Sequence, residues 1–431
     1  MEDYINTRSD FRIEETTGIK KKIFTRVSNG IDIAKGIMDF DDSIRKKKLT
    51  TLFKYLSKTT DEEISQYGTL FPFDLFLNFI LNTNDEEQRL LAFKILAIST
   101  QSGYAEPAFL MKPELFNLCN FYILNQEYSE YVFIILINGA ADEKCCKSFL
   151  MMNVCDLLLN LPITLQLSQL VSNLTYHQSN YLQNLLTLIY KILDDQTTII
   201  NNQPQALINF GVICYAFKSL HHIYEFWDIP REIILEIHSQ FTPIFYFLAP
   251  LILRHSNNSQ VLNSVFRYIL HLVDVKPEFG TIILEAFSNN NIEDPKTLRL
   301  GICVFKKNIE SWRSNFDLKE KLLAYLLPQQ NIHYKTRALF FKVILAYFTF
   351  SESKSDKNVE EVINWCLSFI EDSKMSELAL KELISIKMTF RDNANIFDNV
   401  TNSLPTIEGL IFSNEYEEPI PELASQLINL F

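Results

Sequence analysis

The sequence predicts an all-α fold built from repeated helical units, and three observations carry this prediction. The chain has only 10 glycines among its 431 residues, well below the average of about 7%. This scarcity disfavours Gly-rich sheets and Gly-rich nucleotide-binding loops. Hydrophobic residues make up 47% of the chain, so a large core is expected. Apolar segments of helical length recur along the chain at intervals of about forty residues.

The first three repeats each consist of an apolar helix, a polar turn and a second apolar helix. LFLNFILN (75–82) precedes RLLAFKILAIS (89–99), and LFNLCNFYILN (115–125) precedes YVFIILINGAA (131–141). A shorter third copy combines CDLLLNLP with ITLQLSQLVSNLTYH, which together cover 155–177. The copies agree in both helices and in the turn, which favours true repetition over the alternative of an irregular helical bundle with chance echoes.

Weaker copies continue the series at 212–223, 261–274, 297–310, 336–348 and 376–387. The segment 178–250 is the least repetitive and is a candidate insertion. Periods of about 40–47 residues are typical of armadillo and HEAT arrays, in which each unit buries its apolar face against its neighbours. The sequence therefore predicts an armadillo-type right-handed superhelical solenoid over residues 30–431, preceded by a flexible segment at residues 1–29.

Composition restricts the class of partner. The net charge is −12, so bulk electrostatics disfavours nucleic acid and favours basic peptides.

Seven cysteines without a CxxC motif predict buried thiols in a reducing compartment. The polar start of the chain predicts no signal peptide, and the apolar stretch at 241–253 is too short to span a bilayer. We therefore expect a soluble intracellular protein without a membrane segment.

Catalytic motifs are missing from the sequence. It contains no GxGxxG, GxxxxGK[ST], HExxH or GxSxG. His221 and His222 are adjacent, so a regular helix does not turn both imidazoles toward one metal. Cys145 and Cys146 are more readily two helix residues than a strained vicinal disulfide. The sequence predicts no enzyme activity, no metal and no cofactor.

The stretch FIILINGAAD (133–142) raises the question of what its polar residues do. Asn138 either ends a helix by bonding its own backbone or faces a groove together with Asp142. Helical spacing predicts that Phe133, Leu136 and Ile137 face the core. The same spacing places Ile134, Asn138 and Asp142 on the concave side.

Several segments resemble the importin-alpha family of armadillo proteins. FIILINGAAD resembles the family's third-helix pattern W-A-L-x-N-I-A-G-D, and QLSQLVSNLTYH (166–177) resembles W-T-L-S-N-L-C-R. Residues 33–58 resemble the family's first repeat, and RIEETTGIKKKIFTRV (12–27) resembles a reduced importin-beta-binding segment. The resemblance covers about 30–177 and is only periodic beyond that range.

The resemblance implies an adaptor for nuclear protein import that binds basic cargo peptides in a concave groove and is located in the cytoplasm and the nucleus. In that family, a Trp and an Asn four residues later hold the cargo side chains and backbone. The corresponding pairs here contain no Trp, because Trp227, Trp312 and Trp365 lie elsewhere. The implied groove residues are Phe93, Ile134, Asn138, Asp142, Gln169, Asn173 and Asn308. The implied carrier-binding residues are Lys20, Lys21, Lys22 and Arg26. The alternative is an armadillo-type scaffold that has lost binding of localisation signals.

Overall fold

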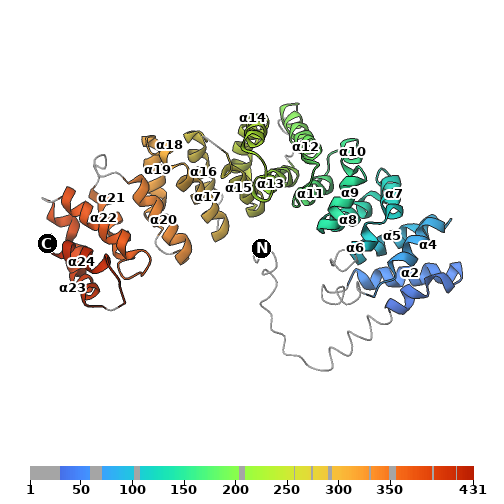
Figure 1. The fold of residues 1–431 in the computed structure, drawn as a ribbon, viewed down its shortest axis with the longest axis horizontal. Coiled ribbons are helices and arrows are strands. Elements are labelled where there is room, and N and C mark those ends of the chain that lie inside the picture. Colours follow the sequence, from blue (N-terminus) through green and yellow to red (C-terminus); the bar gives the residue numbers. More distant parts are fainter. Residues whose placement is uncertain are drawn as a thin grey trace, which may run out of the picture. The chain divides into compact units, whose positions relative to one another are not determined.

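The structure is a computed structural model, and it describes eleven stretches of the chain. They are 30–58, 70–100, 107–202, 209–256, 258–272, 275–289, 294–329, 332–348, 356–390, 393–413 and 415–431. The described residues form α-helices and two short 3-10 helices, η2 (Ile37–Asp39) and η3 (Ala394–Phe397), with no strand among them (Figure 1). The predicted all-α class is therefore confirmed. The predicted flexible segment 1–29 lies outside the described residues.

The chain divides into two compact units, each with its own core. The first comprises residues up to Thr198 together with Glu225–Asp228, and the second comprises Ile199–Tyr224 and Ile229–Phe431. The helices of the first unit are α2 (Asp42–Leu56), α4 (Phe73–Asn82), α5 (Glu86–Thr100), α6 (Pro107–Leu110), α7 (Pro113–Tyr122), α8 (Ser129–Ala140), α9 (Glu143–Met151), α10 (Val154–Leu159), α11 (Leu165–Leu174) and most of α12 (Leu182–Asn202).

Successive helices of the first unit pack in register with the predicted repeats. Helix α5 packs on α2, α8 on α5 and α11 on α8, so four helices from consecutive repeats lie side by side. We call them the ladder helices of this unit. Helices α4, α7 and α9 cover them on a second layer through contacts of α4 with α5 and of α7 and α9 with α8. The helices predicted at 89–99 and 131–141 coincide with α5 and α8.

The second unit has the same two-layer organisation. Its helices are α13 (Phe210–Phe226, whose last turn is assigned to the first unit), α14 (Arg231–His255), α15 (Ser259–Ile269), α16 (Pro277–Asn289), α17 (Pro295–Lys307), α18 (Ile309–Trp312), α19 (Phe316–Leu326), α20 (Tyr334–Tyr347), α21 (Asp356–Leu367), α22 (Ser376–Thr389), α23 (Asp398–Phe412) and α24 (Ile420–Ile428). One layer runs α15, α17, α20, and the other runs α14, α16, α19. We call α15, α17 and α20 the ladder helices of the second unit.

Side-chain caps fix where several helices begin. Asn258, Asp294 and Asn315 precede α15, α17 and α19, and each accepts hydrogen bonds from main-chain N–H groups of the first turn. Such an N-cap contributes about 1 kcal/mol, because it satisfies donors that have no partner within the helix. These three helices therefore begin at positions that the sequence itself specifies.

The three tryptophans each join segments that are 37 to 52 residues apart in the sequence. Trp227 Nε1 donates to the carbonyl oxygen of Thr175 at 2.9 Å, Trp312 Nε1 to that of Val275 at 2.6 Å, and Trp365 Nε1 to that of Leu327 at 2.9 Å. All three indoles are buried. Two of the acceptors, Thr175 and Leu327, are the C-cap residues of α11 and α19. Each indole thus satisfies a carbonyl at the end of an earlier helix pair while its ring fills the core.

No described helix combines the length and the apolar composition needed to cross a membrane.

Candidate functional site

The exposed strip of α8 is the starting point for a site. Ile134 and Asn138 are half-buried at i and i+4, whereas Phe133, Leu136 and Ile137 are buried. The predicted core face of this helix is therefore confirmed. In α11, Gln169 and Asn173 occupy the same i and i+4 positions and are also half-buried. Because α11 packs on α8, these four residues form one open face across two repeats.

The amide groups on this face are used within the protein. Asn138 Nδ2 donates to Thr100 Oγ1 of α5 at 3.1 Å. Asn173 Nδ2 donates to the carbonyl oxygen of Ile137 in α8 at 2.9 Å. Each asparagine therefore joins its helix to the preceding ladder helix. This geometry gives each amide a structural role, because one of its two N–H groups is already bonded within the protein.

Asp142 acts as the N-cap of α9. Its Oδ1 accepts hydrogen bonds from the main-chain N–H groups of Lys144 and Cys145, both at 3.0 Å. Partial burial alone would raise the pKa of Asp142, but the hydrogen bonds from Cys145 and Lys144 outweigh it and lower the pKa. The acid after FIILINGAA therefore starts the next helix, and its charge is retained at neutral pH.

Two of the implied groove residues lie in the core instead. Phe93 is fully buried, and its ring packs edge-on against Tyr122 and Tyr128 at centroid distances of 5.3 and 5.1 Å. Asn308 follows the end of α17, is 6% exposed, and donates from Nδ2 to the carbonyl oxygen of Val304 at 2.8 Å. Neither side chain is accessible, because in α5 position 93 points inward and in α17 the helix ends before position 308.

The implied carrier-binding residues, Lys20, Lys21, Lys22 and Arg26, lie outside the described residues.

The cysteines offer no nucleophile. All seven are free thiols and all but Cys303 are buried. Burial raises the pKa of Cys145 and of Cys146 to about 12, with a smaller contribution from neighbouring acidic groups. A thiol with such a pKa is protonated at neutral pH and reacts slowly.

A shallow groove of about 420 Å³ lies between α4 and α7 in the first unit. Its lining is mostly apolar and includes Phe121, which is 78% exposed. The only charged side chains in the lining are Arg89 and Glu114. The groove therefore lacks the converging polar groups expected of a catalytic site.

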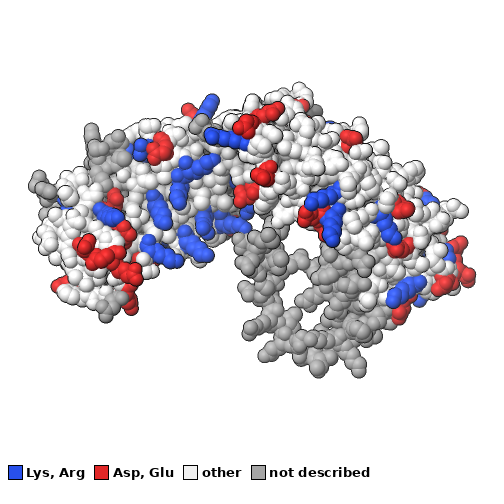
Figure 2. All heavy atoms as spheres, in the orientation of Figure 1, with Lys and Arg blue, Asp and Glu red and all other residues white. Residues whose placement is uncertain are grey.

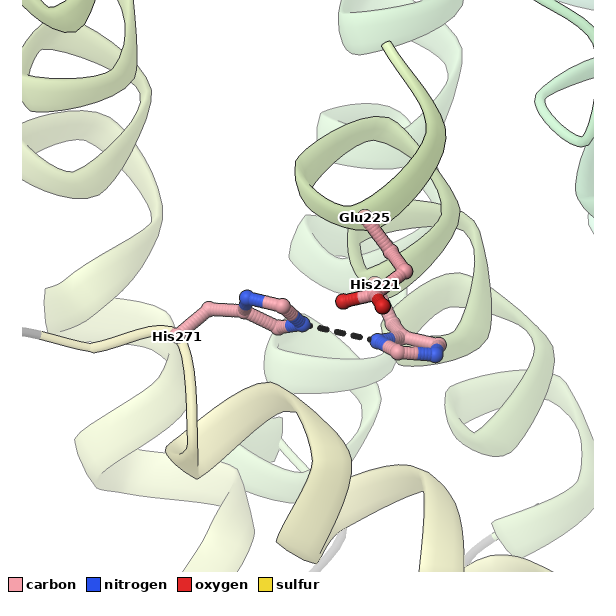
Figure 3. A group of neighbouring side chains, drawn as sticks. All are labelled: His221, Glu225 and His271. Atoms are coloured by element: carbon pink, nitrogen blue, oxygen red, sulfur yellow. Dashed lines mark hydrogen bonds between the residues drawn. The ribbon is translucent and has the colours of Figure 1, made fainter. Parts of the chain in front are cut away.

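One cluster in the second half of the chain has the residue types of a metal site (Figure 3). His221 and Glu225 are one turn apart on α13, and His271 follows the end of α15. Their potential ligand atoms lie within 4.8 Å of one another. In the sequence, His221 stands next to His222 and far from His271. The pairing with His271 was therefore not predictable from the sequence, since it depends on how α13 and α15 pack.

Burial and neighbouring charges determine the protonation state of His221 and His271. Burial lowers the pKa of His221 to about 3 and that of His271 to about 4. The charges of Arg267 and Lys218 act in the same direction on His221, and that of Lys307 acts so on His271. Both imidazoles are therefore neutral at physiological pH.

The hydrogen bonds of the cluster compete with a metal ion. Arg267 Nη1 lies 3.3 Å from His221 Nε2, and His221 Nδ1 lies 2.8 Å from His271 Nε2. An arginine can only donate, so Nε2 of His221 accepts and Nδ1 carries the proton that is donated to His271. A cation would have to displace that proton beside the positive charges of Arg267 and Lys218. The arrangement therefore disfavours a metal ion.

Comparisons with protein-family models and with curated proteins find no match to this chain.

Proposed function

We propose that the chain is an armadillo-type right-handed superhelical solenoid that serves as a protein-binding scaffold. The single observation that carries this choice is the use of Asn138 and Asn173 as bridges between ladder helices. In the importin-alpha family, which residues 30–177 resemble, the equivalent amides clamp the cargo backbone. Here their donors satisfy Thr100 and Ile137, so the clamp is weakened while the repeat stacking is strengthened.

The tryptophans support the same choice. A cargo lysine in that family lies between exposed indole rings, and such contacts depend on accessible apolar surface. In this chain all three indoles are buried and bonded to carbonyl oxygens of earlier repeats. An open face without aromatic slots suits partner segments of another kind.

The half-exposed ladder positions supply the binding surface of the proposed scaffold. Ile134 and Gln169 lie at equivalent positions of two adjacent helices, and neither is needed to fill the core. Repeat arrays present such strips to partners without changing their own backbone. The low chemical reactivity of the thiols and the absence of a polar cluster in the α4–α7 groove fit a binding protein better than an enzyme.

The second candidate is an adaptor for nuclear import that takes basic cargo on the face of α8 and α11. It is favoured by Asp142, which retains a negative charge beside this face. A lysine close to a partly buried carboxylate gains about 1.5–3 kcal/mol. The two candidates thus differ in whether that charge binds a ligand or only caps α9.

Calorimetric titration with a lysine-rich localisation peptide, and a pull-down with an importin-beta carrier, separate them. The scaffold predicts no saturable binding in either experiment. The adaptor predicts peptide binding that Asp142→Lys abolishes. Asp142→Ser is the matched variant, because serine still caps α9 but has no charge. Saturable binding that is weakened by both substitutions would establish the adaptor and reject the scaffold.

A further inference from the structure

Basic side chains gather on one face of the second unit, over α15, α17 and α20 (Figure 2). We call this the basic face. Its members come from four helices and are exposed or half-buried: Lys218, Arg267, Arg299, Lys306, Lys335 and Lys342. The chain as a whole carries a net charge of −12, so this concentration runs against its composition.

Helical spacing places these residues on a common side. In α17, Arg299 and Lys306 are seven residues apart, which is two turns, and Gly301, Val304 and Phe305 on the other side are buried. Lys335 and Lys342 repeat the seven-residue spacing in α20, where Phe340 and Ile344 are buried. The charged residues are therefore opposite the core in both helices.

The four helices lie next to one another in order. Cys214 Sγ of α13 is 3.1 Å from Ser264 Oγ of α15. Lys307 Nζ, at the end of α17, donates to the carbonyl oxygen of Leu272 beyond α15 at 2.6 Å. Tyr347 Oη of α20 donates to the carbonyl oxygen of Phe305 in α17 at 3.0 Å. These contacts fix the order α13, α15, α17, α20, so the basic residues form a continuous strip.

Five of the six basic side chains form no salt bridge with an acidic side chain in the part of the chain that the structure describes. These five are Arg267, Arg299, Lys306, Lys335 and Lys342. In contrast, Lys321 of α19, in the other layer, pairs with Asp317 at 2.8 Å. The strip therefore keeps a positive potential that a partner can use.

The pKa values of two neighbouring side chains, Cys303 and His221, reflect the positive charge of the strip. Burial raises the pKa of the Cys303 thiol, which lies between Arg299 and Lys306 on α17, while both of these charges pull it down. Burial lowers the pKa of His221, and Arg267 and Lys218 lower it further. Two titratable groups on different helices thus experience the positive charge of the same strip.

We propose that the basic face binds an extended acidic segment of a protein partner. This proposal rests on the protein-binding function proposed above and assigns it a partner class. Carboxylate side chains complement the strip in charge, and arginine binds them with two parallel hydrogen bonds. Neighbouring packed helices are about 8–10 Å apart and an extended chain advances about 3.3 Å per residue, so four helices match a segment of roughly ten residues.

An acidic peptide fits this face better than nucleic acid does. A net charge of −12 acts alike on an acidic peptide and on a polyphosphate, so the choice between them depends on what the surface offers besides charge. Single-stranded nucleic acid also requires aromatic side chains on which bases stack. The Phe side chains between Arg299 and Lys306 and between Lys335 and Lys342 are buried. Accessible rings accompany the strip at Tyr215, which Lys218 Nζ covers at 5.8 Å, and at Tyr334, and these two rings do not form a continuous stacking surface.

Fluorescence anisotropy with the full chain and a labelled ten-residue Glu/Asp-rich peptide tests the proposal. We expect saturable binding that weakens as ionic strength rises. The double variant Arg299→Glu/Lys342→Glu should weaken binding by at least about tenfold, as expected for reversing charges inside a recognition strip. The variant Arg299→Gln/Lys342→Gln removes the charges without reversing them, so it should weaken binding less. Circular dichroism of both double variants checks that they remain folded. Lys321→Glu, matched in charge change but on the other layer, should leave binding unchanged.

Three results would overturn the proposal. They are no saturable binding at low salt, an equal effect of Lys321→Glu, and tighter binding of a ten-nucleotide single strand that the double variant abolishes. None of these results bears on whether Asp142 binds a lysine-rich peptide. Failure here is therefore distinguishable from failure of the proposed scaffold function.

Discussion

At the scale of single residues, polar side chains that look like ligand contacts act as joints between repeats. Asn138 and Asn173 each donate to the preceding ladder helix, and Asp142 caps the following helix. The i, i+4 spacing correctly predicted which side of α8 carries Asn138. It could not predict the partner of the amide, because Thr100 belongs to a helix thirty-eight residues earlier.

Removing one of these joints should cost stability even without a ligand. Asn173→Ala breaks the hydrogen bond to the carbonyl oxygen of Ile137. We expect the free energy of unfolding to fall by about 1 kcal/mol in a urea titration, which is typical of a lost intramolecular hydrogen bond. Gln169→Ala, on the same half-exposed face, should change it by less than about 0.5 kcal/mol. Equal effects of the two substitutions would remove the structural role assigned to Asn173.

Glu382 of α22 should make the stability of the protein depend on pH. Burial raises the pKa of its carboxyl to about 7. A pKa raised on folding contributes stability that is complete below the unfolded value, near 4.5, and is lost as pH rises through about 7. Glu382→Gln should therefore be neutral at pH 4.5 and stabilising by about 1–3 kcal/mol at pH 8.

Thermal melts at these two pH values provide the measurement. Glu377→Gln is the matched control, because Glu377 lies on the same helix and forms an exposed pair with Lys381 at 2.5 Å. Exposed pairs contribute little, so this variant should show no gain at pH 8. A pH-independent difference between wild type and Glu382→Gln would show that the carboxyl ionises normally.

At the scale of helices, close packing rather than helix propensity determines which glycines can be replaced by a larger residue. A Cβ atom at Gly139 would lie 2.6 Å from Cζ of Phe149, and one at Gly301 would lie 2.3 Å from Cζ of Phe287. Both glycines let a ladder helix approach an aromatic ring of the covering layer. A Cβ at Gly409 in α23 would meet no atom within 4 Å.

These distances predict opposite effects of the same substitution. Gly139→Ala should destabilise the fold by about 1–3 kcal/mol through overpacking. Gly409→Ala should stabilise it by about 0.5–1 kcal/mol, since alanine is the better helix former. Denaturant titration measures both values. The double variant Gly139→Ala/Phe149→Leu should recover part of the loss, and a failure to do so would locate the strain elsewhere.

The positions of the helices along the chain were largely predictable from the sequence. Which residues of each helix are buried or exposed was less predictable. Apolar periodicity located α5 and α8, because an amphipathic stripe fixes both the helix and its buried side. Phe93 was misplaced because two tyrosines, Tyr122 and Tyr128, cover that side of α5. The basic face could not be predicted, since it requires the relative order and rotation of four helices separated by loops.

At the scale of the whole molecule, the two units have separate cores, and this should divide the response to mutation. Phe93 is fully buried in the first unit and Phe341 is fully buried in the second. Truncating such a ring to alanine costs about 3–5 kcal/mol. The loss should remain within the unit that holds the cavity, because each unit supplies its own packed neighbours.

Hydrogen–deuterium exchange resolved by peptides can detect this division. Phe93→Ala should speed exchange in peptides from α5 and α8 and leave those from α20 and α22 unchanged. Phe341→Ala should give the reverse pattern. A uniform increase across both units for either variant would mean that the chain unfolds as one cooperative block.

The most direct test of the account compares two ten-residue peptides, one lysine-rich and one Glu/Asp-rich, on the same sample of the full chain at the same ionic strength. In this chain Asn138, Asn173 and Asp142 make hydrogen bonds within the protein, and the second unit carries the strip of basic side chains. We therefore predict saturable binding of the acidic peptide, lost in Arg299→Glu/Lys342→Glu, and no saturable binding of the lysine-rich peptide. Tighter binding of the lysine-rich peptide, weakened by Asp142→Ser, would contradict this prediction.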